Sequence, residues 1–252
     1  KRLGSAPAKN SNTQEPPQKE LNALIKLYNE NRLVQVFDEA QKLTKRYTKS
    51  LTLWNLMGAS AAQIGQLDDA IHAFQKALSI KPNYVEAYYN MGNALQDQIK
   101  PEEAIEAYTK AVSIKPDFAE AYNNMGNALK DQGKLEKATE SYSKALSIKP
   151  DYPDAYNNMG VALTGVIFTK PNKDIQKTII SLLDKERYIR PSDIAGSVIS
   201  LLKLDPHLKK HLNVLDTGVI ESPLGVISDL SDLPLLLKLM SICPLPDLEL
   251  EK

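Results

Sequence analysis

The chain has 252 residues, enough for one or two domains, and its 31 basic side chains balance 31 acidic ones. A neutral chain lacks the basic excess that nucleic-acid binding needs, so we expect no nucleic-acid partner. The single cysteine, Cys243, excludes an internal disulfide and favours a reducing, cytoplasmic location, and the absence of a long apolar run predicts no membrane association.

Residues 1–19 are rich in proline and polar side chains and poor in apolar groups. Such a segment cannot offset the entropy of ordering, so we expect a disordered lead-in. From residue 20 the apolar side chains take helical spacing, first at Leu21 and Leu24 and then at Val36 and Ala40. We interpret residues 20–50 as a degenerate N-terminal helical repeat, because a terminal unit turns one face to water.

Residues 51–152 repeat with a constant period of 34 residues. Five columns share it: Trp54, Tyr88, Tyr122 and Tyr156; Gly58, Gly92, Gly126 and Gly160; Ala70, Ala104 and Ala138; Ala77, Ala111 and Ala145; Pro82, Pro116 and Pro150. A period of this length, within the range of roughly 20–50 residues, indicates stacked supersecondary units. We predict three units of two helices each, 51–84, 85–118 and 119–152, whose small residues let the helices approach closely.

The turns inside these units have their own pattern. Gly65 and Gly133 stand where each first helix must end, which predicts a left-handed residue at the helix C-terminus. Ile99 replaces glycine in the middle unit, and Pro101 follows at a suitable first position for the next helix.

Beyond residue 152 the repeat breaks off. Residues 153–165 begin a fourth unit that stops at Gly165, and the repeat pattern does not continue in residues 166–252. This last region carries Leu and Ile at helical spacing, with predicted helix starts at Pro171-Asn172, at Pro191-Ser192-Asp193 and at Ser231-Asp232. We interpret it as a helical spacer, truncated because both ends of the chain read as cut.

The columns of aromatic, Met-Gly, alanine and proline residues form the tetratricopeptide repeat pattern. The stretch from Leu51 to Pro150 resembles that family closely, and the block AEAYNNMGNALKDQGKLEKA is similar to bacterial arrays and to the repeats of peptide O-GlcNAc transferases. The resemblance implies an all-α fold, a right-handed solenoid of antiparallel helix pairs whose first helices line a concave groove. It also implies a protein-interaction scaffold that binds a peptide in that groove.

The groove that the resemblance implies would hold a ladder of asparagines two residues after each tyrosine of the aromatic column, with another asparagine three residues further on in two repeats. An asparagine amide both donates and accepts, so such a ladder can hold the backbone of an extended peptide. Glu86 and Glu120 would form an acidic rung in the same groove, which favours a basic partner segment. The rung argues against a carboxylate clamp, in which Lys and Arg of the first helices hold the terminal carboxylate of a partner. The predicted groove residues are Asn90, Asn93, Asn124, Asn127, Asn158, Tyr89, Glu86, Glu120 and Lys130. The alternative is that these amides only face water.

The C-terminal stretch YIRPSDIAGSVISLLK is similar to the spacer of marine bacterial repeat proteins that end in a methyltransferase or sulfotransferase module. The rival hypothesis is therefore a substrate-recruiting or regulatory arm of such an enzyme, or of an O-GlcNAc-type glycosyltransferase, whose catalytic domain lies beyond Lys252. Within the 252 residues we expect no enzyme and no cofactor, because glycine-rich phosphate loops are absent and strand signals are sparse.

Three further features carry weaker signals. His207 and His211 share a helix face, but no third ligand is evident, so we expect a solvated surface rather than a metal site. Cys243 reads as a small buried apolar residue. The apolar run within residues 161–168 needs a cover, either by self-association through the partial fourth repeat or by the C-terminal helices of the same chain.

Overall fold

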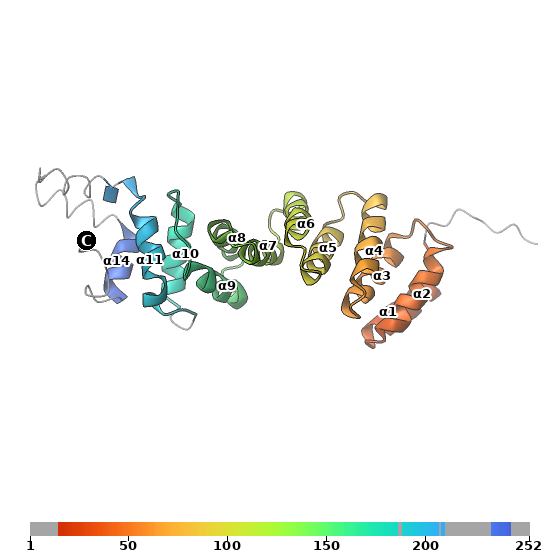
Figure 1. Ribbon diagram of the computed structural model, residues 1–252. Coiled ribbons are helices and arrows are strands. Elements are labelled where there is room, and N and C mark those ends of the chain that lie inside the picture. Colours follow the sequence, from red (N-terminus) through yellow and green to blue (C-terminus); the bar gives the residue numbers. More distant parts are fainter. Residues whose placement is uncertain (1–14, 186–187, 207, 210–232, 243–252) are drawn as a thin grey trace, which may run out of the picture. The chain divides into compact units, whose positions relative to one another are not determined.

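The computed structural model describes residues 15–185, 188–206, 208–209 and 233–242. In these residues every regular element is a helix, and the all-α class expected from the sequence is confirmed (Figure 1). The chain divides into two compact units: unit 1 ends at Pro116, and unit 2 begins at Asp117.

Unit 1 consists of three helix pairs: α1 (Gln18–Asn29) with α2 (Leu33–Thr44), α3 (Leu51–Gln63) with α4 (Leu67–Ile80), and α5 (Val85–Asp97) with α6 (Pro101–Ile114). The earlier helix of each pair is its first helix and the later its second. Helix α1 begins directly after Pro17, so residues 18 and 19 are helical and not part of the predicted lead-in. A proline suits this position because the first helical residues need no N–H donor. Residues 1–14 lie outside the described part.

The two helices of a repeat approach each other at a glycine. A Cβ added to Gly92 would lie 2.6 Å from the ring of Tyr108, and one added to Gly58 would lie 2.7 Å from the ring of Phe74. No side chain fits at that distance, so the glycine column is a packing requirement. Both rings are fully buried in the layer between first and second helices.

The turn inside each repeat uses one left-handed residue, which was predicted at Gly65 and Gly133 and is found at Ile99 as well. Gly65 has φ +79° and Gly133, in unit 2, has φ +70°. Ile99 adopts the same conformation with φ +58°, and its side chain is 87% exposed. Pro101 is the first residue of α6. A β-branched residue in this region of backbone space is strained, so the middle repeat carries a cost that the other two avoid.

Unit 2 contains six helices in its described residues: α7 (Ala119–Asp131), α8 (Leu135–Ile148), α9 (Pro153–Leu163), α10 (Lys173–Leu183), α11 (Pro191–Leu202) and α14 (Pro234–Ile242). Helices α7 and α8 pack like the pairs of unit 1, because a Cβ on Gly126 would lie 2.5 Å from the ring of Tyr142.

Two of the three helix starts predicted beyond the repeats are confirmed. Asn172 caps α10 by accepting hydrogen bonds at 3.1 Å from the N–H groups of Asp174 and Ile175. Helix α11 begins at Pro191. The start predicted at Ser231-Asp232 lies outside the described residues, and α14 is described from Pro234 onward.

Helix α9 is the first helix of the partial repeat, and it is covered in a different way. A Cβ on Gly160 would lie 3.2 Å from the side chain of Ile189, not against an aromatic ring of a second helix. The ring of Tyr188 stacks on that of Tyr156, with centroids 5.2 Å apart and planes 10° apart. In addition, the Ser197 hydroxyl of α11 donates to the backbone carbonyl of Leu163. Residues 188–189 and α11 therefore close the face that a second helix covers elsewhere.

Helix α10 packs on α8, where the hydroxyls of Ser143 and Thr178 are hydrogen-bonded at 2.7 Å. The apolar run after α9 is largely covered by this part of the chain. Its buried members are Ala162, Leu163, Val166 and Phe168. Val161 and Ile167 stay exposed. The intramolecular cover thus accounts for four of the six apolar residues of that run.

Candidate functional site

Asn93 and Asn127 each form a hydrogen bond within their own repeat. The Tyr108 hydroxyl donates to Asn93 Oδ1 at 2.7 Å, and the Tyr142 hydroxyl donates to Asn127 Oδ1 at 2.8 Å. Burial, with a smaller contribution from nearby Asp131, raises the pKa of Tyr142, which keeps this phenol a donor. The predicted groove role of these two asparagines stays a prediction, and their carbonyl oxygens already accept from buried tyrosine hydroxyls.

The sequence contains a signal for this hydrogen bond. In the first repeat the equivalent positions hold Ala59 and Phe74, so the asparagine is missing where the second helix offers no hydroxyl. The acceptor on the first helix and the donor on the second are thus both present or both absent in each repeat.

In unit 2 the first helices α7 and α9 are neighbours, and side-chain amides join them. Asn158 Nδ2 donates to Asn123 Oδ1 at 3.0 Å, and Asn123 Nδ2 donates to Asn124 Oδ1 at 3.2 Å. Asn124 stands two residues before Gly126, about 200° round the helix, on the side of α7 turned away from α8. The structure therefore brings together two predicted residues, Asn124 and Asn158, in what we call the amide row: Asn123, Asn124 and Asn158.

Asn123 is the member of the amide row that sequence reasoning missed. Its side chain is only 4% exposed, and its amide bridges the two predicted residues. The equivalent column of unit 1 holds Tyr89, whose ring lies 6.1 Å from that of Tyr108. Tyr89 is therefore packed against its own repeat. Asn90 is half-buried and makes no side-chain hydrogen bond to a described residue.

The predicted charged residues form surface pairs or face solvent. Glu120 lies 3.4 Å from Lys149, and Lys130 lies 3.6 Å from Asp131. Glu86 is exposed. Exposed ion pairs contribute little to stability, but Lys149 does offset the negative charge expected at Glu120. The acidic rung is therefore weaker in unit 2 than the sequence predicts.

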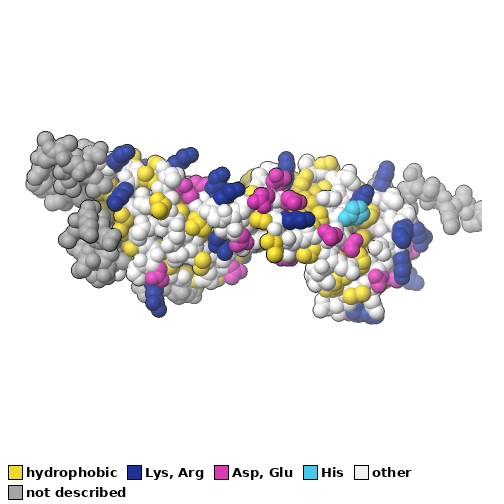
Figure 2. Space-filling view, in the orientation of Figure 1, with side chains coloured by type: hydrophobic (Ala, Val, Ile, Leu, Met, Phe, Trp, Pro, Cys, Tyr) yellow, Lys and Arg dark blue, Asp and Glu magenta, His cyan; other side chains and the backbone are white. Residues whose placement is uncertain are grey.

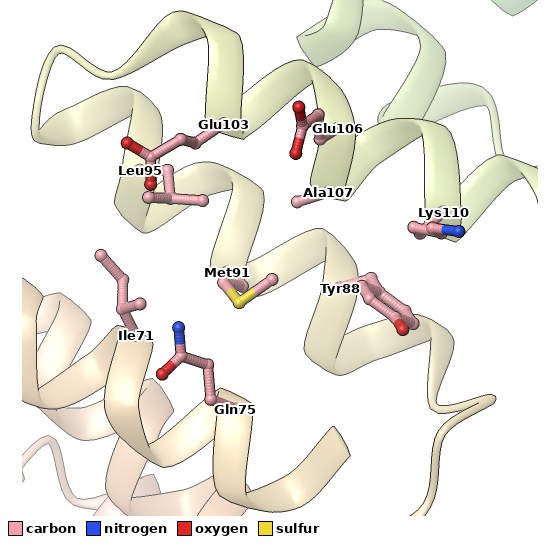
Figure 3. Close-up of a pocket in the computed structure, with 9 residues that line it drawn as sticks. All are labelled: Ile71, Gln75, Tyr88, Met91, Leu95, Glu103, Glu106, Ala107 and Lys110. Atoms are coloured by element: carbon pink, nitrogen blue, oxygen red, sulfur yellow. The ribbon is translucent and has the colours of Figure 1, made fainter. Parts of the chain in front are cut away.

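A separate cavity of about 280 Å³ opens in unit 1 between the second helices α4 and α6 (Figure 3). Its floor is formed by Tyr88, Met91 and Leu95 of α5. Ile71 and Gln75 of α4 line one wall, and the other wall, on α6, is formed by Glu103, Glu106, Ala107 and Lys110. The aromatic and methionine columns of the sequence indicate only core filling, so this opening was not predicted.

Few other groups in the described residues suggest chemistry. No group of three potential metal ligands occurs among them, and none of their helices is long and apolar enough to cross a membrane. His207, His211 and Cys243 lie outside the described part of the chain.

The repeat geometry agrees with comparisons to known proteins. A family model described as TPR repeat matches residues 60–98, 100–133 and 126–164. These segments are tetratricopeptide repeats. The curated relatives match over a shorter stretch: the peroxisomal targeting signal receptor of Candida albicans is 48% identical over 40 residues, and that of Kluyveromyces lactis is 46% identical over 39 residues. Each match covers 16% of this chain and 7% of the relative, so the chain spans less than a tenth of those proteins.

Solved tetratricopeptide structures share the fold over most of the chain. One crystal structure of MamA has a TM-score of 0.59 at 25% identity and covers 67% of this chain and 91% of its own. YrrB, described as a TPR protein with an unusual peptide-binding site, has a TM-score of 0.55 at 19% identity and covers 70% of this chain and 89% of its own. The similarity to YrrB shows the fold alone.

Proposed function

We propose that the tetratricopeptide array is a protein-interaction module, and that its first helices bind an extended peptide through the amide row. The observation that carries this proposal is the chain of amides from Asn158 through Asn123 to Asn124. It runs from one first helix to the next, on the side of α7 turned away from α8.

The amide row is suited to holding a peptide backbone. An asparagine side chain offers two N–H donors and a carbonyl acceptor, which match the alternating N–H and C=O groups of an extended chain. Asn158 uses one N–H on Asn123, while its Oδ1 accepts from no described residue. Asn123, which is buried, holds its neighbours in place, so less side-chain entropy is lost on binding.

The comparisons support the general class of this function. Tetratricopeptide repeats form stacked surfaces suited to binding, and YrrB, which shares the fold, is a protein with a peptide-binding site of its own. The transferase arm suggested by the C-terminal stretch stays a prediction, because the matched segments contain only repeats.

The test begins with random dodecapeptides displayed on phage and selected against the full chain. Enriched peptides are synthesised with a fluorescent label and titrated by anisotropy. We expect Asn158→Ala to weaken binding by about thirtyfold, because roughly two hydrogen bonds near 1 kcal/mol each are lost. Asn124→Ala should weaken binding in the same direction.

The matched control is Asn157→Ala, which removes an exposed amide on the same helix outside the amide row. Its peptide affinity should stay within twofold of the parent chain, with equal helical content by circular dichroism. Equal peptide affinities for Asn157→Ala and Asn158→Ala would contradict the proposal, as would a selection that enriches no peptide.

A further inference from the structure

We propose that the cavity between α4 and α6 is a second interaction surface, which receives an arginine or lysine side chain from a partner protein. We call it the outer cavity and define it by Ile71, Gln75, Tyr88, Met91, Leu95, Glu103, Glu106, Ala107 and Lys110. The proposal rests on the shape of the cavity, the chemistry of its floor and the charge of its rim.

The size of the outer cavity suits one long side chain. At about 280 Å³ it falls just below the range of about 300–1,000 Å³ that is typical of sites for drug-sized molecules. Its floor is mainly hydrocarbon and thioether, from Met91 and Leu95, and Ile71 adds an apolar wall. The aliphatic stem of a lysine or arginine buries well on such a surface while its charged end stays at the rim.

The rim carries two carboxylates that match this charged end. Glu103 and Glu106 are three residues apart on α6, so they lie on neighbouring turns of one face. Both are exposed, and neither forms an ion pair with a described residue. Figure 3 shows the Glu103 carboxylate extending over Leu95, whereas the Lys110 side chain lies at the other end of the opening. A cation bound beside Glu103 therefore meets two carboxylates before it meets Lys110.

A simpler origin explains only part of this charge. Acidic residues in the first turn of a helix are stabilised by the helix dipole, and that accounts for Glu102 and Glu103. Glu106 lies beyond the first turn and has no such explanation. Figure 2 shows acidic side chains over α6 and near α4, with basic side chains among them.

The outer cavity is independent of the predicted groove. Met91 and Leu95 are four residues apart and share one face of α5. The amide row lies on α7 and α9, and none of its residues lines the outer cavity. The two surfaces share no residue, so a ligand in one leaves the side chains of the other free.

The experiment uses the full chain with 13C-labelled methionine methyl groups and two small probes, acetyl-Leu-Arg-amide and its neutral citrulline analogue. Among the described methionines only Met91 lines the outer cavity, and Met159 is fully buried in unit 2 as an internal reference. We expect the arginine probe to shift the Met91 signal selectively at millimolar concentration. The citrulline probe should bind about tenfold more weakly, because it lacks the charge that strengthens a hydrogen bond to carboxylate.

Two variants locate the charge that matters. Changing both Glu103→Gln and Glu106→Gln should weaken the arginine probe about tenfold, whereas Glu102→Gln, on the same helix outside the cavity, should change it less than twofold. Asn158→Ala should leave the Met91 shift intact, which separates this surface from the amide row. The proposal is overturned by an unshifted Met91 signal, by equal shifts from arginine and citrulline probes, or by binding that survives the double substitution.

Discussion

At the scale of single residues, the hydrogen bond between Asn93 and Tyr108 gives a predicted groove residue a structural role. The first repeat solves the same packing problem with Ala59 and Phe74, which need no hydrogen bond. We predict that Asn93→Ala and Tyr108→Phe each lower the free energy of unfolding by about 1 kcal/mol. Gln96 Oε1, 3.1 Å from the Tyr108 hydroxyl, limits the cost of losing Asn93.

The double variant with both changes should lose clearly less than the sum of the two, because it recreates the pair of the first repeat. Urea unfolding of the four proteins measures this double-mutant cycle. Strict additivity would show that the two side chains are not coupled.

Ile99 offers a second test at this scale. Its left-handed backbone and 87% exposed side chain bring strain without burial. We expect Ile99→Gly to raise the free energy of unfolding by about 1 kcal/mol, because glycine adopts this conformation without steric cost. The reverse change, Gly133→Ile, should lower it by a similar amount. An unchanged urea midpoint for Ile99→Gly would mean that the backbone strain is relieved elsewhere.

At the scale of elements, the link between α9 and α10 is tied to α8 through Glu136. Its carboxylate accepts hydrogen bonds from the Thr169 N–H at 2.9 Å and the Thr169 hydroxyl at 2.8 Å. Burial alone would raise the pKa of Glu136, but these hydrogen bonds and the charge of Lys170 outweigh it and lower the pKa.

A carboxyl group with a lowered pKa stabilises the folded chain above its unfolded pKa, which is about 4.3 for glutamate. That contribution is lost as the pH falls below this value and through the folded pKa. We expect Glu136→Gln to lower the free energy of unfolding by about 1 kcal/mol at pH 7 and to have little effect near pH 3. The check is urea unfolding at both pH values, with exposed Glu140→Gln as the control. An equal loss at both pH values would point to packing instead of charge.

Elements also show what the sequence could predict. The pairs built on Gly58, Gly92 and Gly126 were predictable because one contact recurs in every repeat and each copy reports the same packing. The cover of α9 was not predictable, since Ile189 lies far beyond Gly160 in the sequence and has no repeated partner. The outer cavity was not predictable for a similar reason. It depends on the spacing between two second helices, and no residue type in the sequence indicates that spacing.

At the scale of the whole molecule, the packing between helices joins mainly neighbours along the chain. Stacked repeats of this kind gain stability from each pair and from each interface with the next, so damage should stay local. We predict that Gly92→Ala, which forces a Cβ into the Tyr108 ring, speeds amide hydrogen exchange in α5 and α6 far more than in α10 and α11. The control is Gly196→Ala in α11, where an added Cβ meets no atom within 4 Å. Uniformly faster exchange in both units would show that the chain unfolds as one body.

The contact of Ile189 with Gly160 also sets the direction in which such an array can lengthen. A duplicated repeat placed ahead of α9 would bring its own glycine and aromatic ring, because that contact lies within one repeat. The same segment placed behind α9 would first have to displace Ile189 and Tyr188 from the face they occupy. Growth by tandem duplication is therefore one-sided in this chain: new copies are accepted upstream of α9, and the end of the series stays where it is.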